Sequence, residues 1–228
     1  MFLYFILLVI GAYLLGSIPT AYLVARWRRG IDIRRFGSGN VGITNVLASG
    51  SRWSSLIVFV FDLLKGAFPV FLARNIGLQP YQWIIVGLAA ICGHNWTIFL
   101  RFSGGRGILT TLGVILAIAP WLALTMLVLN FLFAPFRQFA VGTLVVLVLI
   151  PLLSWLAPNV FAIEKSASLS IGFVAILLLA VVRRLTAPRS EFAVTVSTGE
   201  LMANRLLFDR DIRDRSTWLK RGKPTNQV

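Results

Sequence analysis

Long apolar segments recur along most of this chain, and they restrict its fold more than any other feature. An α-helix needs roughly 20 apolar residues to cross a bilayer, and it satisfies its backbone polar groups within the segment. With 57% apolar and 13% charged residues, the chain is predicted to be an all-α integral membrane protein. The predicted apolar segments are 2–25, 53–74, 81–100, 108–134, 140–156 and 168–182.

The first of these segments is expected to remain in the protein as a span. It has neither a basic start nor an A-x-A-like cleavage site, so it does not resemble a removable signal peptide. Its Gly16-Ser17-Ile18-Pro19 stretch is expected to kink the helix, because proline removes a backbone donor and clashes with the preceding turn.

Basic residues gather in two places, and their distribution predicts the orientation. Six lie between residues 26 and 52 against one acid, and ten lie between residues 183 and 223 among five acids. Basic residues beside spans hold a loop on the cytoplasmic face. This bias also accounts for the net charge of +14 without a nucleic-acid partner, for which the sequence holds no base-reading motif. The mixed charges of residues 209–215 are expected to form a solvated helix face.

The number of spans follows from this orientation. If the first loop and the tail are both cytoplasmic, an even number of spans separates them. The 108–134 segment is broken by Pro120, so it could be one tilted helix or two short ones. Two short helices satisfy the even count. We therefore predict a polytopic bundle of about seven transmembrane helices with the N-terminus outside, a membrane domain over 1–188 and a polar basic cytoplasmic tail over 189–228.

Two loops between the apolar segments are rich in glycine and short polar side chains. Residues 37–45 read GSGNVGITN, and residues 103–107 read SGGRG. Glycine lets successive backbone N–H groups turn toward one point, and the second loop adds Arg106 and leads into an apolar helix. Such loops suit phosphate, because helix N-terminal amides and arginine both favour an anion. The alternative is that both are only tight turns between membrane helices.

Few side chains could carry other chemistry. The chain has a single histidine, His94, so one chain cannot form a site that needs two histidines. It has a single cysteine, Cys92, which excludes a cysteine metal cluster and an intramolecular disulfide. Asp62 and Lys65 lie on one face of a predicted span. Ionisable groups in a membrane helix usually pair or face a polar cavity, so the two either support the fold or take part in chemistry.

These motifs together resemble those of a known family. Residues 37–47 resemble the first signature, GSGNxGATNxxR, of the bacterial acyl-phosphate:glycerol-3-phosphate acyltransferases. The helix motif of that family is similar to Asp62-Leu63-Leu64-Lys65-Gly66, and its second signature, GHxxPxFxxFxGGKG, is similar to residues 93–107. The Gly16-Ser17-Ile18-Pro19 stretch also fits. The matches keep their order over about half of the chain.

The resemblance implies an enzyme of the bacterial inner (plasma) membrane that begins phospholipid synthesis. It would move a fatty acyl group from acyl phosphate to the 1-hydroxyl of glycerol-3-phosphate, making lysophosphatidic acid and phosphate without a metal or other cofactor. Its partners would be these two substrates and membrane lipids. The motif positions imply catalytic roles for Ser38, Asn45 and Arg106, and substrate-binding roles for Gly37, Gly39, Asn40, Gly42, Thr44, His94, Gly104, Gly105 and Gly107.

The chain departs from the family pattern in four places, the first being Ile43, which replaces the alanine before Thr44. Arg106 replaces a lysine that contacts phosphate. Ala48 replaces the arginine that ends the first signature, and Arg52, one helical turn further on, is a candidate substitute for substrate binding. The third signature, a histidine and an asparagine followed by Arg-Leu and a glutamate, is not recognisable, and the nearest stretch is 182–188. The alternatives are a catalytically impaired paralogue that binds phosphorylated lipid or regulates an active enzyme, and a small-anion or lipid transporter. A transporter predicts loops on opposite faces or a site near the midplane.

Overall fold

The computed structural model describes residues 1–49, 52–163 and 167–220, and all regular structure in these residues is helical. Five helical stretches are long and apolar enough to cross a membrane. The chain is therefore a multi-pass membrane protein, as the apolar segments predict. The spanning stretches are α1 with α2 (Phe2–Ser17 and Thr20–Arg29), α4 (Arg52–Asn75), α5 (Pro80–Asn95) with the turn after it, α8 (Phe139–Leu156) and α9 (Ala167–Leu185).

Two proline-dependent breaks predicted from the sequence are confirmed. The first span is interrupted between α1 and α2, where Ile18 is extended with φ −60° and ψ 113°. A proline ring clashes with the backbone of the preceding residue and disfavours its helical conformation. Proline also has no N–H to continue the helix. The 108–134 segment divides in the same way into α6 (Ile108–Ile118) and α7 (Pro120–Leu132), of 11 and 13 residues. The count of seven crossings and the N-terminus-outside orientation stay predictions.

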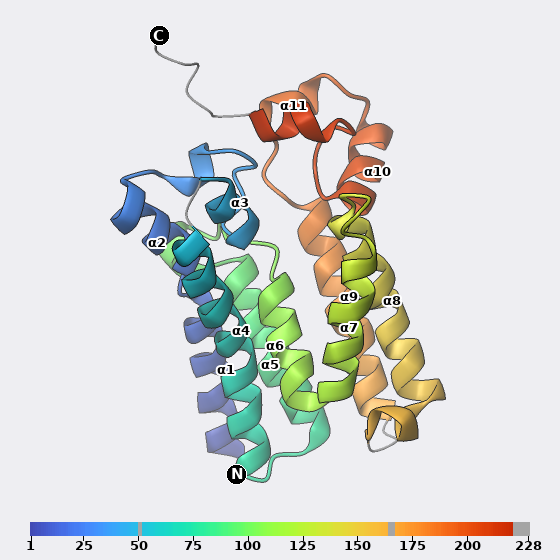
Figure 1. Ribbon diagram of the computed structural model, residues 1–228. Coiled ribbons are helices and arrows are strands. Elements are labelled where there is room, and N and C mark those ends of the chain that lie inside the picture. Colours follow the sequence, from blue (N-terminus) through green and yellow to red (C-terminus); the bar gives the residue numbers. More distant parts are fainter. Residues whose placement is uncertain (50–51, 164–166, 221–228) are drawn as a thin grey trace.

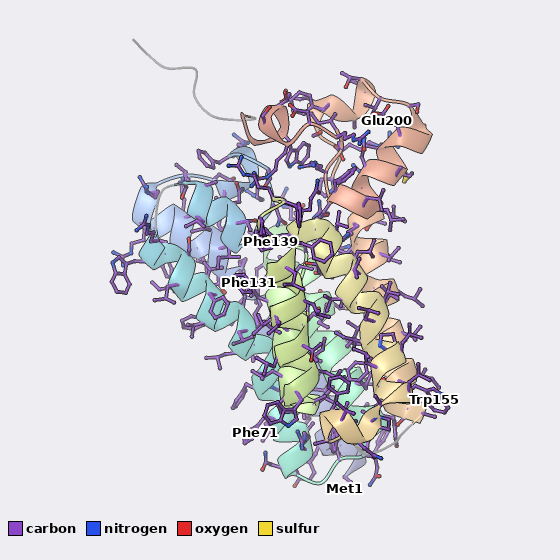
Figure 2. The ribbon with its side chains drawn as sticks, turned by 45° about the vertical axis from the view of Figure 1, so that its right-hand side comes forward. Met1, Phe71, Phe131, Phe139, Trp155 and Glu200 are labelled. Atoms are coloured by element: carbon purple, nitrogen blue, oxygen red, sulfur yellow. The ribbon has the colours of Figure 1, made fainter. Side chains whose placement is uncertain are left out.

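The two glycine-rich loops and the tail lie at the same end of the bundle, which we call the loop end (Figure 1). The loop end carries residues 30–49, 101–107 and 186–220, while the N-terminus lies at the opposite end. In Figure 2, Met1, Phe71 and Trp155 mark that opposite end, and Glu200 marks the tail. The transporter alternative, with its glycine loops on opposite faces, is not supported by this arrangement.

The described part of the tail, residues 189–220, is mostly helical or turned. It contains a 3₁₀ turn at Glu191–Val194, α10 (Thr198–Phe208) and α11 (Arg215–Lys220), and α10 packs on α8 and α9. The expected mixed-charge helix face over 209–215 is wrong, because α10 ends before Asp209, which has a left-handed φ of 56°. Residues 221–228 of the predicted tail lie outside the described residues, and the boundary at 188 stays a prediction.

Close helix crossings fix the position of the loop end. A Cβ added at Gly16 would lie 2.2 Å from Ala90 O, where α1 crosses α5, and one added at Gly113 would lie 2.0 Å from Leu63 O, where α6 crosses α4. Membrane helices associate through such small residues, because these let the backbones approach and make dispersion contacts.

The Gly113→Ala substitution is expected to destabilise the protein by about 1–3 kcal/mol, since the added methyl group meets backbone that cannot move without separating α4 from α6. Thermal unfolding in detergent measures the loss. Gly11→Ala is the matched control, because a Cβ at Gly11 meets no atom within 4 Å. Equal unfolding temperatures for the two variants would contradict the importance of the crossing.

Candidate active site

The first glycine-rich loop is built around the amide of Asn45. This side chain is buried in α3 (Ile43–Ala48), and its Nδ2 donates to the carbonyls of Ile33, Phe36 and Asn40 at 3.0, 2.8 and 3.1 Å. Its Oδ1 accepts from the backbone N–H of Ser38 at 3.3 Å. One amide thus satisfies backbone groups on both sides of the turn. Asn45 holds the loop in shape, and its predicted contact with substrate remains a prediction.

Two glycines give this loop its path. Gly37 and Gly39 have φ of 53° and 70°, which side chains other than glycine rarely adopt. A Cβ at Gly37 would also lie 2.4 Å from Asn45 Oδ1. Between the two glycines, Ser38 is partly exposed, and its Oγ accepts from the backbone N–H of Asn40 at 3.4 Å. The serine hydroxyl is therefore placed by the loop at a partly open surface.

The other residues predicted from the first signature lie around the same turn. Gly42 precedes α3 with extended backbone, and its N–H donates to the carbonyl of Asn40 at 3.1 Å. Thr44 is exposed on the first turn of α3, and Arg52 is exposed at the start of α4. The substrate-binding roles of Thr44 and Arg52 stay predictions.

The second glycine-rich loop packs directly on the end of α5. The Gly105 N–H donates to the His94 carbonyl at 3.0 Å, and a Cβ at Gly104 would lie 2.0 Å from the same oxygen. A Cβ at Gly107, whose φ is 71°, would lie 2.6 Å from Asn95 Oδ1. A Cβ at Gly105 would meet both His94 Nε2 at 2.2 Å and Val41 O at 2.5 Å. Glycine is required at these three positions because the loop backbone lies against the end of α5. At Gly105 the second loop also contacts the first loop, at Val41.

Arg183 holds the second loop from the other side. Its Nε and Nη2 donate to the carbonyls of Gly105 and Gly104, both at 2.7 Å, and its guanidinium lies 5.7 Å from the Trp96 ring centroid. Arg183 is 3% exposed, so these contacts replace its hydration. Arg183 thus holds the carbonyls of Gly104 and Gly105 against the end of α9. The sequence analysis placed Arg183 only in the nearest match to the third signature and gave it no role.

Arg106 is fixed between α9 and the tail. Its Nη1 donates to the Arg183 carbonyl at 3.3 Å, and its Nε lies 2.9 Å from Asp209 Oδ1. The second contact is an ion pair whose angle does not meet hydrogen-bond geometry. The Arg106 and Asp209 side chains are 15% and 22% exposed, so the pair is shielded from solvent but reachable. The tail therefore touches a residue of the predicted site.

A second set of polar contacts fastens the tail to α9. Arg205 Nε donates to Asp211 Oδ1 at 2.7 Å and Arg205 Nη1 to the Leu185 carbonyl at 2.8 Å, while Asp211 Oδ2 accepts from the Ser190 N–H and hydroxyl. Burial alone would raise the pKa of Asp211, but the hydrogen bonds from Arg205 and Ser190 outweigh it and lower this pKa below its ordinary value. Arg184 adds a contact with the Leu206 carbonyl at 2.6 Å.

A buried ion pair lies beneath the two loops. Lys65 Nζ is 2.7 Å from Asp62 Oδ1 and donates to the Ile18 carbonyl, 3.1 Å away, at the break in the first span. His94 Nδ1 lies 3.8 Å from the same Asp62 oxygen. A small cavity, with room for about one water molecule, is lined by these side chains, by residues 16–21 and by Gly104 and Gly105. Polar groups of α4 and α5 thus extend from the membrane interior to the second loop.

This geometry matches a known family. The sequence profile of the family described as glycerol-3-phosphate acyltransferase matches residues 6–189. The chain belongs to the glycerol-3-phosphate acyltransferase family. It is 49% identical to glycerol-3-phosphate acyltransferase 5 of Dehalococcoides mccartyi, over 97% of this chain and 95% of that protein. It is 48% identical to glycerol-3-phosphate acyltransferase 4 of the CBDB1 strain of that species, over 95% and 94%.

A solved structure has the same fold. The chain superposes on the glycerol 3-phosphate form of PlsY, an integral membrane glycerol 3-phosphate acyltransferase, with a TM-score of 0.74 and 30% identity, over 92% of this chain and 96% of that one. The resemblance to the acyltransferases is thereby confirmed. The family profile ends at residue 189, whereas the 97% match to the Dehalococcoides mccartyi protein continues into the tail. The tail is therefore shared with close members of the family.

The structure brings together most of the residues predicted for an acyltransferase site. The two loops meet at Val41 and Gly105, and Arg106, His94 and the buried pair lie beside the second loop. What the sequence analysis missed is a second Arg-Leu pair, Arg205-Leu206, which is followed by an acid as in the third signature. The Arg-Leu dipeptide itself was the available sequence signal, and in the structure Arg205 forms a buried ion pair with Asp211.

Proposed function

We propose that the protein transfers a fatty acyl group from acyl phosphate to the 1-hydroxyl of sn-glycerol-3-phosphate in the bacterial inner membrane. The observation that carries this proposal is that two glycine-rich loops meet, together with one arginine, at one end of a membrane bundle. Both substrates carry a phosphate, and such loops bind phosphate. Solved structures of PlsY in glycerol 3-phosphate and lysophosphatidic acid forms support the same substrate and product.

We assign the two loops to different parts of the reaction. Gly104, Gly105 and Gly107 would line the cradle of glycerol phosphate, with Arg106 supplying a fixed positive charge. Ser38, held between Gly37 and Gly39, would lie beside the acyl carbon and donate to the oxygen that becomes negative. Asn45 would act through the loop shape, which its four hydrogen bonds maintain. We also assign Arg205 and Asp211 as counterparts of the arginine and glutamate of the third signature.

The reaction itself needs positioning more than activation, because acyl phosphate is already a mixed anhydride. The glycerol O1 forms a bond to the acyl carbon, and the bond between that carbon and the bridging phosphate oxygen breaks. The hydroxyl proton passes to the departing phosphate, which leaves as hydrogen phosphate. This route needs no side-chain base. Donors placed at the carbonyl oxygen lower the barrier, since negative charge develops there.

Acyl transfer by the purified protein in detergent tests the proposal. We expect lysophosphatidic acid from acyl phosphate and glycerol-3-phosphate, with one phosphate released for each ester formed. Glycerol is the matched acceptor without a phosphate, and an acyl thioester is the matched donor without one; neither should give product. A folded protein that makes no product would favour the impaired paralogue, and equal use of glycerol would contradict the phosphate cradle.

A further inference from the structure

Arg106 is held in one orientation by contacts on two sides of its guanidinium. Its Nη1 donates to the carbonyl of Arg183, the residue that also binds the second loop, and its Nε is ion-paired with Asp209 of the tail. The hydrogen bond and the ion pair act on two different nitrogens of the guanidinium, so together they restrict its rotation. Because a guanidinium recognises phosphate through donors that lie in its plane, orientation decides whether its remaining N–H groups face the ligand.

Asp209 is placed for this contact by its own backbone. It follows the last residue of α10 with φ 56° and ψ 39°, and its N–H donates to the Arg205 carbonyl at 3.1 Å. Arg205 is in turn anchored to Asp211 and to the end of α9. A chain of contacts therefore runs from α9 through α10 to the carboxylate, so the position of Asp209 depends on the folded tail.

The lysine of the family signature does not need such a partner. An ammonium is a point charge with rotatable donors, and it can approach a phosphate from many directions. An arginine at this position can bind a phosphate through two N–H groups at once only when the plane of its guanidinium is held in the right orientation. Asp209 also places one negative charge beside Arg106, Arg183 and Arg184, whose mutual repulsion it offsets.

We propose that Asp209 is a positioning residue for glycerol phosphate: it orients the Arg106 guanidinium, so that substrate recognition by the second loop depends on the docked tail. The inference rests on the proposed function for the identity of the substrate. It makes the tail, which lies beyond the family profile, a part of the binding site.

The Asp209→Asn variant of the full chain tests this inference. We expect the KM for glycerol-3-phosphate to rise about tenfold, because the Arg106 guanidinium loses the ion pair that orients it, with little change in kcat. Asp209→Glu, which keeps the charge, should recover part of the loss. Asp214→Asn is the matched control: it removes the same charge from the same tail, but the Asp214 carboxylate accepts hydrogen bonds from Ser216 and Thr217 and is not the partner of Arg106.

The decisive comparison uses an Arg106→Lys background. If Asp209 acts by orienting a guanidinium, Asp209→Asn should have almost no further effect on KM there, whereas a purely structural role would give the same loss in both backgrounds. An unchanged KM in Asp209→Asn, or a lower one, would overturn the inference while leaving the proposed function intact. If the wild-type protein is inactive, calorimetric binding of glycerol-3-phosphate replaces KM, and absence of binding would overturn both.

Discussion

Ser38→Ala is expected to lower kcat by about 10²- to 10³-fold with little change in unfolding temperature. The loop fixes the serine from its backbone, because the Ser38 N–H donates to Asn45 Oδ1 and the flanking glycines take left-handed conformations. The hydroxyl itself makes one long loop contact, accepting from the Asn40 N–H at 3.4 Å, so alanine should largely preserve the path of the loop. What is lost is a donor beside the acyl carbonyl, where charge develops in the transition state. Steady-state formation of lysophosphatidic acid measures the effect.

Ser49→Ala is the control for this prediction. Ser49 ends α3 in the same loop region, and its hydroxyl donates to the Val46 carbonyl at 2.6 Å, away from the glycines. Activity close to wild type is expected. If Ser38→Ala retained full turnover, or if it unfolded as a strongly destabilised protein, the placement of Ser38 at the reacting group would be wrong.

Much of the fold is predictable from the sequence, because each segment that crosses a bilayer must be a long apolar helix. The apolar segments near 53–74, 81–100, 140–156 and 168–182 became helices α4, α5, α8 and α9 with small shifts at their ends. Pro19 and Pro120 set the two breaks through local backbone chemistry, which a sequence displays directly. The position of the glycine loops between apolar segments was also predictable, whereas their composition left open both a phosphate site and plain tight turns.

The tail was not predictable in the same way. Arg205 and Asp211 are both charged residues in a polar region, and the sequence favours a solvated surface for them, yet both are buried. Their burial depends on contacts with Leu185 and Ser190, in a segment that composition alone does not bring near. The pairing of Arg106 with Asp209 joins residues far apart in the chain. Local patterns carry no information about such pairs.

The pair Asp62–Lys65 left two interpretations open in the sequence, support of the fold or direct chemistry. Both side chains are almost fully buried, at 2% and 5% exposure, and their nitrogen and oxygen lie 2.7 Å apart. Lys65 also donates to the Ile18 carbonyl, where the broken first span leaves a backbone acceptor without its usual helical donor. These contacts join α1, α2 and α4 beneath the loops, which favours a supporting role.

Removing one partner of this pair should therefore have the largest effect on stability. We expect Asp62→Leu or Lys65→Met to destabilise the protein by about 3–5 kcal/mol, because either change leaves one charge buried and unpaired. The double variant should cost much less than the sum, since replacing a buried pair by apolar residues of similar volume is often nearly neutral. Thermal unfolding of all four proteins gives the coupling energy.

Activity of the double variant then separates the two interpretations. If the pair only supports the fold, the double variant should retain most of its turnover at a temperature where it is folded. The cavity between the pair, His94 and the second loop should tolerate the change, because its other lining residues, 16–21, Gly104 and Gly105, are not altered. A stable double variant without turnover would assign the pair to the reaction. Additive destabilisation by the two single changes would show that the ion pair is not the unit that stabilises this region.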